Sequence, residues 1–498
     1  MYLSLILPLL LPSALRPAED PLLIAVRTAS GITANLTQDL LLTGSGTRLN
    51  LDGTYTLRIG SGGKYVSSFK SALGDTTGFD GTHTWEADRA GATRICALGN
   101  EDVEKTTAAL LTGYWLVPGV VADIKAVNGN TLSLRLKGSE IEPHVLLDKA
   151  TNLPVKVTYS GEAGLVEIDF SDYRKVGSQT RPFKIKMVEG GVSDELQIDS
   201  AVSVPTDHAA FAMPKWTASD VTFDDSIPKE LPTKRLPSGH IMVHPLVDGK
   251  DVGWFILDSG AEAMCIDKGT ADAMNLKSVG MVPAVGVGGV VKVPFREADS
   301  MTLGQGTFKD LMFVELDLAE ISKMLGVKLG GIIGYDVFRR AIIEMQVGST
   351  KVSLADPANY KLKSGTWQPI LFDGGNIGVQ ANFEGNRTGW FRLDTGAAGT
   401  VSFHTPFVEK YKLLDKRPVV RTQEGGVGGI VEASQGKLAY FEIAKHRFEK
   451  PTVVFSTAKI GAMSSKWLVG NIGQDFMNPF VMIFDYPNSR MAFVEAAK

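Results

Sequence analysis

Cysteine, excess positive charge and long apolar runs are all scarce in this 498-residue sequence. The only two cysteines, Cys96 and Cys265, lie far apart, which excludes a disulfide scaffold and a cysteine-built zinc site. Lys and Arg number 51 against 55 Asp and Glu, a formal net charge of −4, so no basic surface is available to bind nucleic acid. No apolar stretch reaches the roughly 20 residues of a membrane-spanning helix. No motif calls for a metal or another cofactor, and we expect none.

A short apolar run at residues 2–11 is the sequence's closest approach to a targeting signal. Its length is typical of the apolar core of a secretory signal, so we predict a signal peptide over residues 1–20. Cleavage is expected between Ala14 and Glu19. The alternative is a buried strand or helix. The signal interpretation implies a periplasmic or secreted protein.

Glycine is abundant, at 53 residues, and many segments alternate apolar and polar residues. This period of two is typical of half-buried strands, and runs such as 55–59 and 166–170 have it. We therefore expect a mainly β fold, with an N-terminal β domain over 21–218. Three prolines and several charges at 219–237 predict a linker.

The remainder of the chain is an internal repeat. The segment 253–261 aligns with 389–397 at an offset of 136, with seven of nine residues identical. The segments 286–290 and 331–338 recur in the same order at offsets of 140 and 139. Two copies are too few for a solenoid, so we predict two similar lobes about a pseudo-twofold axis. They cover 238–356 and 370–498, with a linker at 357–369.

Each copy carries one aspartate after a mostly apolar strand: Asp258 in the first and Asp394 in the second. A single Asp-Ser/Thr-Gly triplet would indicate only a turn. Twofold symmetry, however, would bring the two carboxyl groups together at the interface of the lobes. Such a pair holds one proton over a range of pH, because both groups cannot readily ionise. The ionised carboxylate can then activate a water molecule while the protonated one polarises a carbonyl.

The repeated motif resembles that of the retropepsin-like aspartic proteases, with two lobes fused as in pepsin-like enzymes. The residues that carry the resemblance are Asp258-Ser259-Gly260-Ala261 and Asp394-Thr395-Gly396-Ala397, with Ile332-Ile333-Gly334 and Asn471-Ile472-Gly473. Asn471 departs from the apolar residue usual there. The resemblance covers about 238–496. It implies two tandem β-barrel lobes that form a pseudo-twofold bilobal protease, preceded here by a curved antiparallel sheet.

The resemblance also implies supporting roles within the site. Ser259 and Thr395 would hydrogen-bond across the lobe interface, and Gly260 and Gly396 would let the backbone approach the carboxylates. Two glycine-rich segments would form flaps over an extended peptide; plain hairpin turns are the alternative. Their residues are Gly286, Val287, Gly288 and Gly289 in the first copy, and Gly426, Val427, Gly428 and Gly429 in the second.

Residues 144–188 have the pattern strand, turn, strand, and the segment 81–88 lies upstream of them. With these segments the N-terminal domain resembles, in pattern more than in fixed residues, the half-barrels of lipoprotein-carrier proteins. Two interpretations stay open: an apolar ligand bound within the sheet, or a structural domain whose interior is filled by side chains. The spacing of His240 and His244 would suit zinc on a helix, but the apolar residues between them favour a strand.

These observations predict an aspartic endopeptidase that acts on peptide or protein substrates as a monomer with intramolecular lobe pairing. The alternative is a non-catalytic peptide- or lipid-binding envelope protein with the same fold. The sequence does not define the cleavage specificity, or whether the N-terminal segment is removed as a pro-segment.

Ala261 and Ala397 resemble the retropepsin form of the loop rather than the pepsin form, which often has a hydroxyl residue there. The resemblance implies that a hydrogen bond to the ionised dyad is missing. We therefore predict a mildly acidic to near-neutral optimum for peptide cleavage. Initial rates measured from pH 2 to 9 test this prediction, and a maximum near pH 2 would contradict it.

Overall fold

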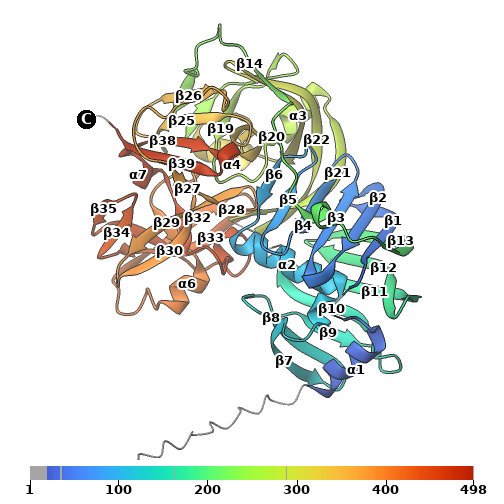
Figure 1. Ribbon diagram of the computed structural model, residues 1–498. Coiled ribbons are helices and arrows are strands. Elements are labelled where there is room, and N and C mark those ends of the chain that lie inside the picture. The colour runs from blue at the N-terminus through green and yellow to red at the C-terminus, as the bar shows by residue number, and fades with distance from the viewer. Residues whose placement is uncertain (1–19, 34–35, 162, 288, 497–498) are drawn as a thin grey trace, which may run out of the picture.

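The computed structural model describes residues 20–33, 36–161, 163–287 and 289–496. The predicted signal peptide, apart from Asp20, lies outside these residues. Figure 1 shows three bodies: an N-terminal domain (blue to green), lobe 1 (yellow-green) and lobe 2 (orange to red). The fold is mainly β, as predicted, with curved antiparallel sheets. No helix in the described part of the chain is long and apolar enough to cross a membrane.

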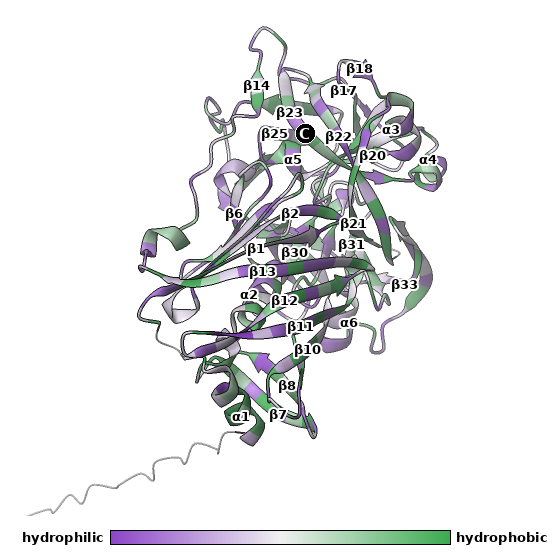
Figure 2. Cartoon of the chain, turned by 90° about the vertical axis from the view of Figure 1, so that its right-hand side faces the viewer, coloured by the Kyte–Doolittle hydropathy of each residue, from purple (hydrophilic) through white to green (hydrophobic). Residues whose placement is uncertain are grey.

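The N-terminal domain is one curved antiparallel sheet of 13 strands, seen from its side in Figure 2. Alternate residues of its strands point inward, as at Tyr55, Leu57 and Ile59. Helices α1 (Pro21–Ser30) and α2 (Leu98–Thr112) pack buried apolar residues against this sheet. In spatial order the strands are β6 (Thr93–Ile95), β5 (Thr84–Ala87), β4 (Asp75–Phe79), β3 (Tyr65–Lys70), β2 (Leu51–Ile59), β1 (Asp39–Arg48), β13 (Val192–Val204), β12 (Gln179–Glu189), β11 (Gly164–Val176), β10 (Pro154–Gly161), β9 (His144–Leu147), β8 (Thr131–Leu136) and β7 (Val121–Asn128).

Side chains fill much of the interior of this domain. Two clusters of buried apolar residues lie between the sheet and its helices, one of them around Trp115 and Phe170. A cavity beside that cluster, lined by Ile32, Trp115 and Arg181, has a volume of about 30 Å³. A volume of that size holds about two water molecules. The cavity as it stands therefore favours the structural interpretation of the domain over a bound acyl chain.

The two lobes repeat one strand topology, which follows from the sequence repeat. In both lobes the strand before the Asp pairs in parallel with the strand of the later glycine motif. The next three pairings across the sheet also correspond, β24–β20, β20–β23 and β23–β22 with β37–β31, β31–β36 and β36–β33. In lobe 1 the strands are β16 (Ile241–Val243), β17 (Leu246–Val247), β18 (Lys250–Asp251), β19 (Trp254–Leu257), β20 (Cys265–Asp267), β21 (Lys277–Gly286), β22 (Gly289–Leu303), β23 (Gly306–Leu316) and β24 (Leu329–Ile333). In lobe 2 they are β28 (Leu371–Asp373), β29 (Asn376–Phe383), β30 (Arg387–Leu393), β31 (Val401–Phe403), β32 (Val419–Gly426), β33 (Gly429–Lys437), β34 (Tyr440–Ile443), β35 (His446–Glu449), β36 (Thr452–Ser456) and β37 (Gly470–Ile472).

Short helices join the strands in equivalent places of the two lobes. Each later glycine motif opens one such helix, α5 in lobe 1 and α7 in lobe 2. The helices of the lobes are α3 (Lys268–Met274), α4 (Ala319–Leu325), α5 (Tyr335–Phe338), α6 (Thr405–Lys410) and α7 (Gln474–Met477).

A separate five-stranded sheet joins the lobes. Strand β25 from the end of lobe 1 pairs with β38 near the end of lobe 2, so each lobe contributes to one continuous ladder. Its strands, in spatial order, are β26 (Lys351–Ala355), β25 (Ile342–Gln346), β38 (Phe480–Asp485), β39 (Arg490–Glu495) and β27 (Gln368–Pro369). One apolar core, which includes Phe338, Phe372 and Phe484, extends through both lobes.

The two segments that we expected to be linkers also form strands. Within 219–237, β14 (Val221–Phe223) pairs with β23 and β15 (Thr233–Arg235) pairs with β16. Within 357–369, β27 joins the sheet between the lobes. These segments therefore supply backbone hydrogen bonds to the lobes in addition to connecting them.

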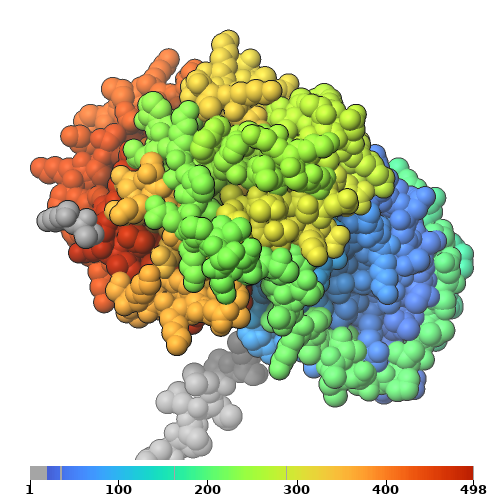
Figure 3. Space-filling model, turned by 90° about the horizontal axis from the view of Figure 1, so that it is seen from above, coloured from blue at the N-terminus to red at the C-terminus, as the bar shows by residue number. Residues whose placement is uncertain are grey.

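The N-terminal domain packs directly against the lobes, as Figure 3 shows for its contact with lobe 1. At lobe 2, the backbone N–H of Asn100 donates to the carboxylate of Asp373 (2.8 Å) and the Trp467 indole donates to Asp102 (3.0 Å). The same carboxylate of Asp373 also accepts from the backbone of Gly99. The two bonds to Asp373 satisfy free N–H groups at the start of α2.

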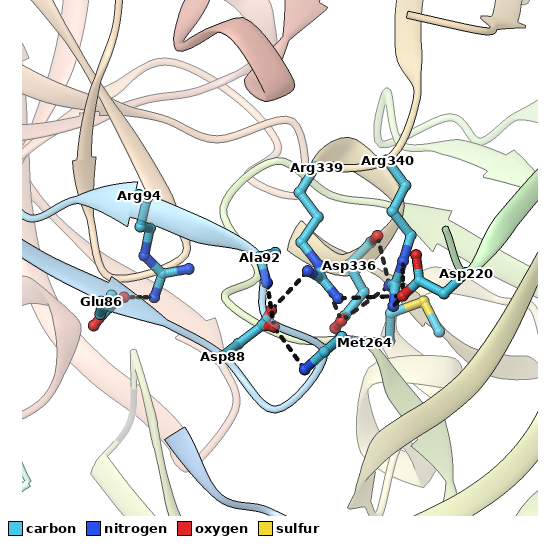
Figure 4. A network of polar contacts seen from close by, with 10 residues as sticks. Glu86, Asp88, Ala92, Arg94, Asp220, Met264, Asp336, Arg339 and Arg340 are labelled. Carbon is cyan, nitrogen blue, oxygen red and sulfur yellow. Dashed lines mark hydrogen bonds and ion pairs between the residues drawn. The ribbon is translucent and has the colours of Figure 1, made fainter. Parts of the chain in front are cut away.

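Two adjacent arginines after α5 connect the N-terminal domain and the 219–237 segment to lobe 1 (Figure 4). Arg339 is paired with Asp88 at 2.8 Å, and Arg340 donates from Nε to Asp220 at 2.9 Å. Asp336 accepts from Arg340 and also from the backbone N–H of Met264, just beyond the first Asp turn. The two arginine side chains are only 4% and 1% exposed, so their charges depend on these carboxylates.

Asp220→Asn should therefore lower the free energy of unfolding by about 3 kcal/mol, because it removes the nearest carboxylate from the buried Arg340 guanidinium and leaves only that of Asp336, at 3.4 Å. Urea unfolding monitored by tryptophan fluorescence measures the change. The matched control is Glu449→Gln, which breaks the exposed pair with Arg447 and should cost about 0.5 kcal/mol or less. Equal losses in the two variants would show that the buried network contributes little.

Candidate active site

Asp258 and Asp394 each begin a tight turn at the end of a buried strand, β19 and β30 respectively. Residues 255–257 and 391–393 have little or no exposure, which fixes both strands within the core. The backbone N–H of Asp258 donates to the carbonyl of Ile333 (2.9 Å), and that of Asp394 donates to Ile472 (3.0 Å). The later glycine motif of each lobe therefore holds the start of each Asp turn.

The two turns are joined by a reciprocal exchange of hydrogen bonds. Thr395 Oγ1 accepts from the Ser259 N–H (2.8 Å) and donates to the Leu257 carbonyl (2.9 Å). Ser259 Oγ accepts from the Thr395 N–H (3.1 Å) and donates to the Leu393 carbonyl (2.7 Å). Both hydroxyl residues are 1% exposed. Each lobe thus satisfies polar backbone groups of the other, which brings the two aspartates together.

The carboxyl groups meet over the glycines of the two turns. The N–H of Gly396 donates to Asp258 (3.1 Å) and to Asp394 (3.0 Å), and the N–H of Gly260 donates to Asp258 (2.7 Å). A β-carbon at Gly260 would lie 2.5 Å from the carboxyl carbon of Asp394, and one at Gly396 would lie 2.3 Å from that of Asp258. Only glycine leaves room for this approach.

The close approach raises the pKa values of both aspartates. Burial and the charge of Asp394 raise the pKa of Asp258 to about 8. Burial also raises the pKa of Asp394, while the positive charge of Arg392 opposes the increase. The two groups titrate as a pair, and the pair retains one proton at neutral pH. Two half-buried carboxyl groups that share a proton can supply an acid and a base at one point.

Three further side chains support the dyad, and sequence analysis did not assign them this role. His240 Nε2 lies 2.8 Å from the Gly396 carbonyl, Gln474 donates to the Thr395 carbonyl (2.5 Å), and the Asn471 amide lies 3.4 Å from Asp394 Oδ2. Asn471 had been visible only as a departure from the apolar pattern. His240 precedes a strand and does not lie on the helix that a zinc pair with His244 would need, and its Nδ1 is 2.8 Å from Ser238 Oγ. His244 is instead paired with Asp251. No group of residues suited to a metal ion occurs in the described ranges.

The two glycine-rich segments form the tips of β-hairpins that meet each other. We define flap 1 as β21–β22 and flap 2 as β32–β33. A β-carbon at Gly286 would lie 2.3 Å from the Val427 carbonyl oxygen, and one at Gly426 would lie 3.1 Å from the Val287 side chain. Gly289, Gly428 and Gly429 have positive φ angles and form the tight ends of the hairpins. Gly288 lies outside the described residues.

The flaps differ in their surroundings. The N-terminal domain holds flap 1: the Met281 N–H donates to the Leu49 carbonyl (2.8 Å) and Lys292 donates to the Gly191 carbonyl (3.1 Å). The register of flap 1 shifts between Val279 and Val282, beside this contact. Flap 2 is more open to solvent, with Val420 62% and Ile430 67% exposed. One flap is therefore fixed to a second domain while the other presents apolar side chains to solvent.

Comparison with known proteins supports the protease-like character of lobe 1. A sequence model of the aspartyl protease family matches residues 243–337, roughly a fifth of the chain, and this match includes Asp258 and flap 1. No curated protein matches the chain. A solved structure of a LolA superfamily protein from Nitrosomonas europaea is similar with 10% identity and a TM-score of 0.27, covering 38% of this chain and 96% of that one. The chain thus contains an aspartyl protease-like region.

Thr395→Val should lower the free energy of unfolding by about 3 kcal/mol. The change removes two cross-lobe hydrogen bonds and leaves the Ser259 N–H and Leu257 carbonyl buried without partners. Thermal and urea unfolding measure the loss. Thr388→Val, on the exposed part of the same strand β30, is the control and should change stability by less than about 0.5 kcal/mol. A similar small effect for both would mean that the hydroxyl exchange does not stabilise the lobe interface.

Proposed function

We propose that this protein is an aspartic endopeptidase whose active site is the intramolecular pair Asp258 and Asp394. The observation that carries the proposal is the contact of the two carboxyl groups over Gly260 and Gly396, where one N–H donates to both. The match of lobe 1 to the aspartyl protease family supports the same chemistry.

The reaction that this geometry favours is direct attack by water on a peptide carbonyl. The ionised carboxylate accepts a proton from the water molecule, and the protonated carboxyl group donates a hydrogen bond to the carbonyl oxygen. Proton transfer to the amide nitrogen then allows the C–N bond to break, and the pair returns to its singly protonated state. The backbone N–H groups of Gly260 and Gly396 orient the carboxylates throughout.

The substrate in this proposal is an extended peptide. It would lie between the dyad and the flaps, adding its backbone to the exposed hairpin edges. Closure of both flaps would exclude water from the cleft. We propose that the enzyme acts as a monomer in the periplasm or after secretion. The alternative, a non-catalytic envelope protein that binds peptide or lipid, makes a different prediction for the dyad variants.

Asp258→Asn and Asp394→Asn should each abolish cleavage of a peptide library, with at least a thousandfold loss of kcat/KM, because neither lobe alone supplies both acid and base. Mass spectrometry of the digested library measures the activity. Glu449→Gln, which changes an exposed residue of β35 that pairs with Arg447, is the control and should cleave normally. Circular dichroism should show that all three variants remain folded. Activity in either dyad variant would exclude a single shared site, and an inactive parent protein would favour the binding alternative.

The rate of peptide cleavage should fall as the pH rises through about 8, since the pair then loses the proton that serves as its acid. Initial rates measured across this pH range test the prediction.

The free energy of unfolding gives a second, independent test of the raised pKa. Because folding raises the pKa of Asp258, the folded state retains a proton that the unfolded chain releases above about pH 4. The contribution of Asp258 to stability should therefore decrease between about pH 4 and pH 8, and Asp258→Asn should remove this decrease. An unfolding free energy with the same pH dependence in both proteins would contradict the raised pKa.

A further inference from the structure

One row of side chains crosses the sheet of lobe 1 beside Asp258, and it is apolar throughout. Residues paired across neighbouring strands point to the same face of a sheet. The pairings of β16, β19, β24, β20, β23 and β22 place in one row Met242, Ile256, Ile332, Cys265, Val314 and Phe295. All six belong to one apolar cluster.

The equivalent row in lobe 2 is polar. The same succession of pairings, through β29, β30, β37, β31, β36 and β33, gives Gly378, Arg392, Asn471, Ser402, Val454 and Gln435. Four of the apolar residues of lobe 1 are thus replaced by residues with hydrogen-bonding groups. The replacement of Ile332 by Asn471 is therefore part of a larger pattern.

Both rows adjoin the dyad. Asn471 lies 3.4 Å from Asp394, and the charge of Arg392 acts on the same carboxyl group. In lobe 1, burial and the charge of Asp258 raise the pKa of the Cys265 thiol to about 12, so this thiol stays neutral. Both rows therefore lie beside the dyad, and most of their side chains are less than 10% exposed in this structure. A peptide held at the dyad would lie next to both rows.

The flaps extend the same difference. Val282, Ala284, Val291 and Val293 of flap 1 pack against the apolar row. In flap 2 the residue equivalent to Ala284 is Glu424, whose carboxylate accepts a hydrogen bond from Ser402. The equivalents of Val291 and Val293 in flap 2, Val431 and Ala433, stay apolar. The polar character of lobe 2 therefore extends to its flap at Glu424.

The difference between the two rows affects substrate binding, because buried polar groups in the row of lobe 2 disfavour an apolar substrate side chain beside them. Arg392 is 6% exposed, and its buried Nε has no hydrogen-bond partner among the described residues. An apolar substrate side chain would leave such groups unpaired, at a cost of about tenfold or more in affinity. A side chain with both donor and acceptor atoms would pair with them.

We propose that the cleft selects peptides in which an apolar residue, held by lobe 1, and an uncharged polar residue, held by lobe 2, lie on opposite sides of the scissile bond. The proposal rests on the proposed function for the bond that is cleaved. It goes further in naming the substrate class and the residues that define it, Ile256 and Ile332 against Arg392 and Asn471.

Four peptides that differ only in their central pair, Phe-Gln, Gln-Phe, Phe-Phe and Gln-Gln, test the proposal. Their affinities are measured by fluorescence anisotropy with Asp258→Asn, a protein expected to bind without cleaving. One of the two mixed orders should bind about tenfold more tightly than either uniform peptide. Binding of Phe-Phe that equals or exceeds both mixed peptides would overturn the proposal. Cleavage by the parent protein is measured separately, so an enzyme that fails to cleave would refute the proposed function without affecting the binding comparison.

Exchange of equivalent residues gives the matched controls. In the same background, Asn471→Ile should improve Phe-Phe binding relative to the preferred mixed peptide by about tenfold, and the reciprocal Ile332→Asn should improve Gln-Gln. Gln435→Phe, at the partly exposed end of the row, provides a second substitution if Asn471→Ile does not fold. Unchanged ratios in the folded variants would show that these rows do not determine specificity.

Discussion

The exchange of hydroxyl groups between Ser259 and Thr395 is the interaction on which the rest of the candidate site depends. Two carboxyl groups repel each other when ionised, and burial opposes their ionisation further. The exchange holds them together because each lobe would otherwise leave buried backbone groups of the other without partners. The raised pKa of Asp258, and with it the retained proton, is a consequence of this enforced proximity.

Much of the geometry of the candidate site could be predicted because the two copies of the repeat place equivalent residues at equivalent positions. Two Asp-Ser/Thr-Gly-Ala segments at matching positions indicated both the twofold arrangement and the meeting of Asp258 with Asp394. The mainly β fold followed from the period-two alternation of the strands. Both predictions use patterns within the sequence itself, the internal repeat and the alternation of apolar and polar residues. Neither requires knowledge of which distant residues contact each other in the fold.

The features that could not be predicted depend on contacts between residues that lie far apart in the sequence and outside the repeat. His240 contacts the Gly396 carbonyl from a segment that has no counterpart in the repeat motifs. Arg339 and Arg340 had no visible partners in sequence, since Asp88 and Asp220 lie more than a hundred residues away. The apolar and polar rows were hidden for another reason: strand pairing, rather than sequence order, brings their members together. The segments 219–237 and 357–369, expected to be linkers, contain strands because their backbone N–H and C=O groups pair with neighbouring strands of the sheets.

The five-stranded sheet between the lobes has a consequence for synthesis of the chain. Strand β38 begins at Phe480, long after lobe 1 has been translated, and it is the strand that pairs with β25. A nascent chain can fold its N-terminal domain and lobe 1 while this partner is still missing. The carbonyl of Ile472, which holds the Asp394 turn, also lies near the end of the chain. The paired carboxyl groups can therefore form only when nearly all of the polypeptide is available to fold.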